Sequence, residues 1–407
     1  MEMTINKLPA PTWNRLGMNE SRISNITIDA AWKAQIQVPN AAITRESTEI
    51  DWNSLNSGLG QDMDILGASI EADSFHVENN TLGNEPVVYR LQYRDTHNYY
   101  NKVQIYAEEN SESSYIFITA NESGCTGLSA LQVKVYAKNG AKVRLYFAQL
   151  LDNSYDILHD VGGFCEEDAS VEIVYISLGG NRVYAGGLID LQGQRSGMDA
   201  KIGYLGRDDQ HIDMNYVARH QGAKTESNME ISGILRDQAF KLFRGTIDFL
   251  HGSSGAVGNE KEDVLLIGDD VVNQTIPLIL CAEEDVEGNH GATIGKLDES
   301  MLFYLGSRGI SKEEAERIIP MGFDLISTTL SGYTRESQEV KAVNLDLIRQ
   351  IHAITDIPII AEGKIRCEQE AVEALKAGAH AVVVGTSITR PENITERYVE
   401  AIRAAED

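Results

Sequence analysis

The sequence holds few residues whose type and spacing could do chemistry, and His290 is the first of them. It lies in the glycine-rich stretch EGNHGAT at residues 287–293. An imidazole can bind a metal ion or move a proton near neutral pH. No second histidine or cysteine stands near it at the spacing of a metal site. From the residues alone we therefore expect an ordinary loop or core histidine with satisfied hydrogen bonds.

The cysteines show no site pattern either. They are Cys125, Cys165, Cys281 and Cys367, which lie far apart and form no CxxC pair. Metal-binding and redox cysteines usually come in such close pairs. We expect four reduced thiols, most of them buried.

Length and charge exclude several classes of function. A chain of 407 residues with 42% hydrophobic content can form two or three globular domains. Its formal net charge of -26 repels nucleic-acid phosphates and anionic lipids, so we expect no nucleic-acid partner and no membrane binding. No apolar run approaches the roughly 20 residues of a membrane helix, and the N-terminus resembles no signal peptide. We expect a cytoplasmic protein.

The elements that must position His290 come before it in the chain. Residues 1–85 have an irregular pattern, which we assign to an N-terminal irregular or helical region. Residues 86–285 are predicted to be strand after strand, because apolar residues alternate with polar ones. Examples are KVRLYFAQ with Val143, Leu145 and Phe147, SVEIVYIS with Val171, Ile173 and Tyr175, and HIDMNYVA with Ile212, Met214 and Tyr216.

Alanines recur just after small or acidic turn residues, at irregular intervals. They are Ala141, Ala169, Ala200, Ala223, Ala239 and Ala256. A quasi-repeat of strand, turn and small residue favours a β-solenoid, in which each coil stacks on the one before it. Few hairpin turns of the Asn-Gly type occur, which favours the same choice. A β-sandwich remains the alternative.

The remaining chain is predicted to be helical and then α/β. Residues 286–320 form a C-terminal helical region, with Asp298 and Ser311 as helix caps. Residues 321–407 contain three strand-then-helix units, whose strands lie in FDLISTT, PIIAEG and HAVVVGTS. Such units describe a parallel sheet covered by helices, here less than half of an eight-unit barrel. Pro320 separates the two patterns.

Residues from about 10 to 319 resemble the SufB/SufD family of iron–sulfur cluster assembly scaffolds, and its SufD branch in particular. The match is carried by PTWNRLGMN, FRGTIDF, LLIGDD and above all VEGNHGATIGKLDESMLFYLGSRGISKEEAERII from residue 286. The resemblance implies a right-handed parallel β-helix with helical ends. It also implies that the protein is a scaffold and not an enzyme. Such a scaffold works with a SufB-like subunit and the SufC-like ATPase.

The same resemblance gives His290 a role. Its position is similar to that of the SufD histidine that faces SufB and takes part in forming the nascent cluster, so His290 becomes a candidate iron ligand. SufB-like chains carry a cysteine where this sequence has Val271, and a glutamate where it has Gly291. The chain alone thus lacks the usual thiolate, and we expect a transient cluster shared with a SufB-like partner and none bound by this chain alone. SufC-like docking is in doubt, because the chain leaves the family at about Pro320.

From Phe323 onward the sequence resembles the N-acetylmannosamine-6-phosphate 2-epimerases, which are TIM barrels. The match rests on GFDLISTTLSGYT, IPIIAEGKI and AVVVGTSITRPENITERY. It implies proton transfer by Glu362 and phosphate binding around Gly363, Gly385 and Thr386. The early strands of that family, with its catalytic lysine, are missing from the sequence, so we expect no epimerase activity.

Three hypotheses for the whole chain stay open. The first is a SufD-like scaffold with a foreign C-terminal appendage. The second is a sugar-phosphate epimerase with a fused domain. The third is a fused or misassembled gene product whose tail has no function.

Overall fold

The computed structural model describes most of the chain in two separate units. The described residues are 1–12, 14–83, 85–267, 270–297, 326–328, 342–354 and 357–390, with 394–395, 398–399 and 402–403 near the C-terminus. Unit 1 comprises Met1–Lys296 and unit 2 comprises Leu297–Asp407. The division falls inside the last long strand of unit 1 rather than at Pro320.

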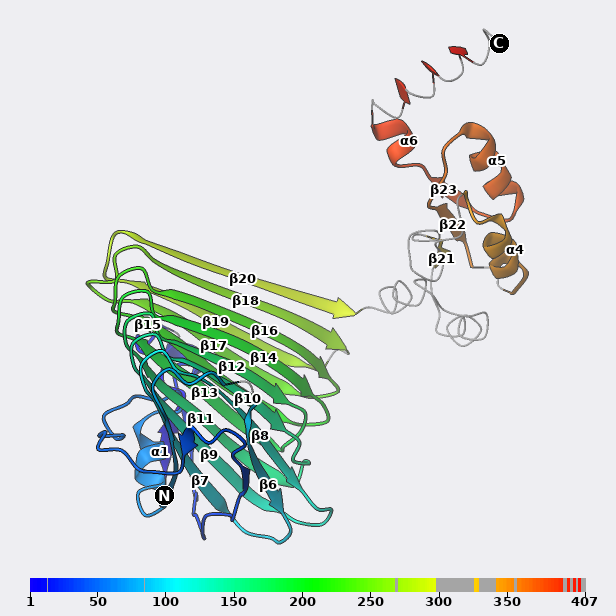
Figure 1. The fold of residues 1–407 in the computed structure, drawn as a ribbon. Coiled ribbons are helices and arrows are strands. Elements are labelled where there is room, and N and C mark those ends of the chain that lie inside the picture. Colours follow the sequence, from blue (N-terminus) through cyan, green and yellow to red (C-terminus); the bar gives the residue numbers. More distant parts are fainter. Residues whose placement is uncertain are drawn as a thin grey trace. The chain divides into compact units, whose positions relative to one another are not determined.

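Unit 1 is a β-solenoid made of two sheets of nine strands (Figure 1). From β5 onward, successive strands alternate between the sheets, so each coil contributes one strand to each. The first sheet contains β3 (Gln35–Gln37), β6 (Val87–Tyr93), β8 (Glu112–Asn121), β10 (Lys142–Gln149), β12 (Ser170–Ser177), β14 (Gly197–Gly206), β16 (Glu226–Arg236), β18 (Ala256–Ile267) and β20 (Val286–Leu297). The second contains β4 (Ile43–Thr44), β5 (Ala72–Val77), β7 (Tyr99–Ala107), β9 (Gly127–Ala137), β11 (Tyr155–Cys165), β13 (Arg182–Leu191), β15 (His211–His220), β17 (Phe240–Phe249) and β19 (Val272–Cys281). The predicted β-solenoid is confirmed, and its right-handed sense stays a prediction.

The strands stack in register, so that equivalent positions of successive coils lie above one another. In β10, for example, Leu145 is aligned with Tyr115 on β8 and with Ile173 on β12. All three are buried in the lumen, the space between the two sheets. The alternation predicted for KVRLYFAQ and SVEIVYIS is therefore confirmed. Stacking of this kind buries one continuous core along the whole solenoid.

One corner of the solenoid repeats a left-handed residue at almost every coil. Positive φ angles occur at Asn80, Asn110, Gly140, Asp168, Arg195, Lys224 and Gly255. The residue after each is small and buried: Thr81, Ser111, Ala141, Ala169, Ser196, Thr225 and Ala256. The predicted alanine repeat was irregular because serine and threonine take this place in some coils, Ala239 belongs to the opposite corner, and Ala200 lies within β14.

The two ends of the solenoid differ. At the start, the short strands β3 and β4 pair antiparallel with β6 and β5 and close the stack. At the other end, β19 and β20 each have a hydrogen-bonded neighbour on one side only among the described residues. β20 occupies residues 286–297, at the start of the region expected to be helical, and it extends the first sheet beside β18. The helices expected from Asp298 and Ser311 fall outside the described residues.

The N-terminal segment covers the outer face of the second sheet. It contains β1 (Met3–Ile5), the 3-10 turn Asn14–Leu16, β2 (Ser21–Ile23) and α1 (Gln61–Leu66), with β1 and β2 paired antiparallel. Arg244 of β17 is fully buried under it and donates to Asp213 and, over 2.7 Å, to the carbonyl oxygen of Met18. This cover explains why β15 is buried on both faces, not only at the predicted lumen positions Ile212, Met214 and Tyr216.

Unit 2 contains the strand-then-helix units expected from the sequence. They are β21 (Ile326–Ser327), α4 (Leu345–Ile354), β22 (Ile359–Glu362), α5 (Glu368–Lys376), β23 (Ala381–Val383) and α6 (Thr386–Thr389). The strands form a parallel sheet in the order β21-β22-β23. Ile348, Ile359 and Ala374 are at the centre of its small core. The described residues of this unit show three strands and no barrel, so the TIM-barrel-like arrangement is not confirmed.

Candidate functional site

His290 lies on β20, at the open end of the solenoid, and is exposed. The register with β18 follows from the outer face, where Asn289 donates to the side-chain oxygen of Asn259 over 3.1 Å. The neighbouring residue Gly288 points into the lumen, since an added Cβ would lie 3.0 Å from Ile279 and 3.1 Å from Phe249. Strand alternation then places His290 on the lumen side, one strand beyond Glu260. It is therefore an exposed edge-strand residue, and not the loop or core residue expected from its sequence.

Glu260 is a buried carboxyl group directly below His290 in the same row. Only 4% of its surface is exposed. Its carboxyl group crosses the lumen to Gly245 on β17, where an added Cβ would overlap it. Its Oε2 atom has no hydrogen-bond partner among the described residues. Gly245, part of the FRGTIDF motif, thus leaves the room that this carboxyl group occupies.

A buried ion pair lies beside Glu260. Lys241 forms a salt bridge with Glu262, and both side chains are 0% exposed. The Lys241 ammonium group also donates to the Thr275 hydroxyl group over 3.0 Å, and that hydroxyl group donates to Glu262 Oε2 over 2.6 Å. Both oxygens of Glu262 are therefore engaged, one by Lys241 and one by Thr275.

Burial controls the protonation of this group of side chains. The pKa of Glu260 is raised to about 8, mainly by burial and also by the neighbouring Glu262 charge, while Lys241 opposes the shift. Burial also lowers the pKa of Lys241, against the attraction of Glu262. At neutral pH Glu260 thus carries a proton, because an uncompensated carboxylate in the lumen costs free energy.

A column of asparagines follows the outer face of the first sheet to the same end. Asn259 donates to Asn228 over 3.0 Å, and Asn289 donates to Asn259 over 3.1 Å. Asn289 therefore ends this column on the edge strand that also carries His290. The lumen side and the outer face of β20 both present polar side chains.

The cysteines are only partly as expected. Cys125 and Cys165 are buried, whereas Cys281 and Cys367 are exposed. Cys281 ends the edge strand β19, where no further coil covers it among the described residues. The same residues contain no group of three His, Cys, Asp or Glu side chains that could hold a metal ion. His290 is therefore not part of a complete metal site within this part of the chain.

The candidate residues of the tail lie in unit 2. Glu362 ends β22, and its side chain lies 3.4 Å from the Ser327 hydroxyl group at the end of β21. Gly363 follows with a φ of 100°. Gly385 lies between β23 and α6, and Thr386 is the first residue of α6. The carboxyl ends of the three strands thus bring together the residues predicted from the epimerase resemblance, as expected for a parallel sheet.

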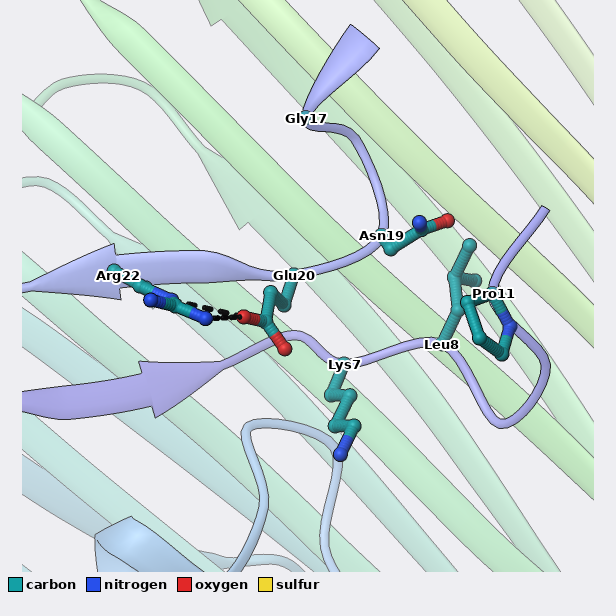
Figure 2. Close-up of a pocket in the computed structure, with 7 residues that line it drawn as sticks. All are labelled: Lys7, Leu8, Pro11, Gly17, Asn19, Glu20 and Arg22. Atoms are coloured by element: carbon teal, nitrogen blue, oxygen red, sulfur yellow. Dashed lines mark hydrogen bonds and ion pairs between the residues drawn. The ribbon is translucent and has the colours of Figure 1, made fainter. Parts of the chain in front are cut away.

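A surface hollow on unit 1 contains none of the predicted residues. It has a volume of about 560 Å³ and is formed by the N-terminal segment (Figure 2). Arg22 donates to Glu20 over 2.9 and 2.7 Å at its rim. The lining residues are Lys7, Leu8, Pro11, Gly17, Asn19, Glu20 and Arg22. Arg22 and Glu20 pair with each other at the surface, and we assign the hollow no site.

Sequence reasoning missed Lys241, Glu260 and Glu262. A signal was present, because residues 256, 258 and 264 set an alternation that places 260 and 262 in the lumen. The charged run NEKED reads instead as a solvated strand, since Glu and Lys are seldom buried. In the described residues, no helix is long and apolar enough to cross a membrane.

Two family models match the chain. The model described as "SUF system FeS cluster assembly, SufBD core domain" matches residues 89–323. The model described as "Putative N-acetylmannosamine-6-phosphate epimerase" matches residues 296–404. The second match begins at residue 296, the last residue of unit 1, and the two matches overlap between residues 296 and 323.

Individual proteins resemble one part of the chain or the other. The iron-sulfur cluster assembly protein SufD of Bacillus subtilis is 34% identical over 134 residues, which cover 33% of this chain and 31% of SufD. A putative N-acetylmannosamine-6-phosphate 2-epimerase of Caldanaerobacter subterraneus is 54% identical over 90 residues, covering 22% of this chain and 37% of that protein. The solved epimerase of Clostridium perfringens shares 35% identity over 28% of this chain and 42% of its own, with a TM-score of 0.21. The chain thus spans about a third of the length of the first two relatives.

Proposed function

The chain belongs to the SufBD core family of the SUF system for FeS cluster assembly, and from that premise we propose that it is a SufD-like scaffold subunit. Its proposed partners are a SufB-like subunit and a SufC-like ATPase, and a transient iron–sulfur cluster is its cargo. The observation that carries the proposal is the exposed position of His290 on the edge strand β20. The similarity to the B. subtilis SufD supports it.

His290 has the chemistry that this role needs. A neutral imidazole binds iron through one ring nitrogen. A cluster also needs thiolates, and in the described residues no further Cys or carboxylate completes a three-residue site around His290. We therefore propose that a SufB-like partner supplies the thiolate, and that this chain presents His290 to it from the open end of the solenoid.

The two partners are expected to respond differently to the tail. The edge strands β19 and β20 precede residue 298, so binding of a SufB-like subunit is expected to be retained. The family match ends at residue 323, and the epimerase-like sequence replaces what would follow. Binding of a SufC-like ATPase is therefore expected to be weakened relative to a SufD without this tail.

Co-expression with candidate SufB-like and SufC-like chains tests the proposal. The complex is isolated anaerobically, and the cluster yield is measured from iron, sulfide and visible absorption. We expect His290→Ala to lower the cluster yield while the complex stays intact. His251→Ala is the matched control, because His251 is 92% exposed at a corner of the same solenoid. Equal cluster yields from the wild type and His290→Ala would exclude the proposed role of His290.

A second candidate function is epimerisation of a sugar phosphate by the tail. It is favoured by the 54% identity to the Caldanaerobacter epimerase and by the position of Glu362 at the end of β22. The chain covers only 37% of that relative and lacks the family's lysine, so we expect no turnover of N-acetylmannosamine 6-phosphate even at high protein concentration. Turnover that is lost in Glu362→Gln would contradict this expectation.

A tail without function gives a different result in the same assays. Removal of residues 321–407 would then leave solubility and partner binding unchanged. Loss of either property would assign the tail a role in folding or in assembly.

A further inference from the structure

The lumen below His290 contains a carboxyl oxygen without a partner. We propose that Glu260 and His290 together bind one divalent first-row metal ion, Fe²⁺ in the setting of cluster assembly. This inference rests on the proposed function, because it takes His290 as an iron ligand. It adds Glu260 as a second donor from this chain, a residue that the SufD resemblance did not point to.

The first argument is the register of β18 and β20. The bond from Asn289 to Asn259, at 3.1 Å, fixes an offset of one coil between the two strands. A second bond joins Thr293 to Asp263 on the same outer face. Residues 260 and 290 are therefore neighbours in the lumen row, on strands that lie about 4.8 Å apart. Side chains at such a spacing can bind one ion together.

The second argument is the state of the Glu260 carboxyl group. A buried polar atom without a partner is rare in a folded protein, because its desolvation is not compensated. Glu260 is 4% exposed, and its Oε2 atom has no partner among the described residues. The space for this group exists because residue 245, opposite it, is glycine. The site is thus shaped for a carboxyl group and leaves one oxygen to bind a ligand.

The third argument separates Glu260 from Glu262. The oxygens of Glu262 are bonded to Lys241 and Thr275, so Lys241 already serves as the cation of that carboxylate. Lys241 has no hydrogen bond to Glu260 in the structure. The ion pair keeps the two glutamates distinct. Glu260 is the one that lies in the same lumen row as His290 and whose Oε2 atom has no partner among the described residues.

At neutral pH Glu260 carries a proton, so the metal ion displaces this proton to solvent when it binds. The site then offers one imidazole nitrogen and one carboxylate oxygen, which are donors that Fe²⁺ accepts readily. Two protein donors leave several positions of the ion open, for a thiolate of the partner and for sulfide. An ion held this way would be loaded before the partner completes the cluster. The same two donors also suit Co²⁺ and Mn²⁺. Co²⁺ can therefore replace Fe²⁺ as a spectroscopic probe of the site.

The test is an anaerobic titration of the full chain with Fe²⁺, and with Co²⁺ followed by its visible absorption. We expect His290→Ala and Glu260→Gln each to weaken binding by at least about 10-fold, the loss typical of groups that support a bound metal. Glu230→Gln is the matched control, since Glu230 is an exposed glutamate on the outer face of β16. Far-UV circular dichroism and the urea midpoint of each variant confirm that it is folded.

The outcomes separate this inference from the proposed function. Weaker binding in both variants, with the control unchanged, supports a shared site. Weaker binding in His290→Ala alone overturns the role of Glu260 and leaves that of His290. Unchanged binding in His290→Ala, or no saturable binding by the wild type, overturns the shared site. Either result also shows that His290 does not bind metal in the isolated chain. The effect of His290→Ala on cluster yield in the complex is a separate measurement.

Discussion

Replacing Glu260 by glutamine should change how the stability of the solenoid depends on pH. Burial raises the pKa of Glu260 from its ordinary value of 4.5 to about 8. The groups around it, Lys241 and Glu262, form their own ion pair in the lumen. Glutamine has nearly the same shape and carries no titrating proton. The variant therefore removes the protonation equilibrium and leaves the packing close to that of the wild type.

The direction and size of this pH dependence follow from the protonation of Glu260 in the folded and unfolded states. At pH values between the pKa of Glu260 in the unfolded chain and its pKa in the folded chain, the folded chain keeps the proton of Glu260 and the unfolded chain has lost it. Unfolding then releases one proton, so stability is fully present below the unfolded pKa and falls as pH rises. Each pKa unit corresponds to 1.36 kcal/mol, so the wild type should lose about 4 kcal/mol between about pH 5 and pH 8 through this group. Glu260→Gln should lack this loss.

Other buried groups do not disturb the comparison. Burial raises the pKa of Asp160 to about 6 and lowers that of His159 to about 3. Asp160 destabilises the fold as pH rises through its window, and His159 destabilises it as pH falls below its ordinary value. Both are present in the wild type and the variant, so they cancel in the difference.

The assay is urea unfolding of both proteins at several pH values between about 5 and 8.5. All three tryptophans lie in the first 52 residues, so their fluorescence reports unit 1 alone, and far-UV circular dichroism reports the strands of the whole solenoid. Coincident transitions show that unit 1 unfolds cooperatively. Parallel pH slopes for the wild type and Glu260→Gln would refute the reasoning.

Two further substitutions test how the solenoid is held together. Asp213→Ala leaves the buried Arg244 guanidinium group without its carboxylate and should destabilise unit 1 by about 3–5 kcal/mol, with earlier proteolysis of the N-terminal segment. As a control, Asp209→Ala should cost less than about 0.5 kcal/mol in the same urea unfolding, because Asp209 is exposed. Gly245→Ala forces a Cβ against the Glu260 carboxyl group and should lower the free energy of unfolding by about 1–3 kcal/mol. If Gly245→Ala costs the same when it is made in a Glu260→Ala background, this contact is not the cause.

The general architecture could be predicted from the sequence because alternation is a local signal. Val143, Leu145 and Phe147 mark a strand whatever lies next to it. The length of one coil could not be predicted in the same way. The corner that repeats is defined by a left-handed backbone, which asparagine, aspartate, glycine, arginine and lysine all adopt here. Because five residue types adopt this conformation, no single residue type marks the repeat in the sequence.

The candidate site was also predictable only in part. His290 was identified through the long SufD-like motif around it, and its own spacing gave no signal. Glu260 and Lys241 were missed because their burial depends on the opposite sheet, where Gly245 makes room for Glu260 and Glu262 pairs with Lys241. Contacts across the lumen join residues from different coils and different sheets. Only the register of the strands reveals them.

The solenoid has a direction, because its first coil is closed and its last described coil is not. The antiparallel end strands β3 and β4 are only 3 and 2 residues long, whereas the end strands β19 and β20 are 10 and 12 residues long and have a neighbour on one side only among the described residues. A body with two open ends can add copies without limit and form fibres. A body with one can join a second body once, end to end, and growth then stops. Closure of the first coil therefore favours pairs of chains over filaments.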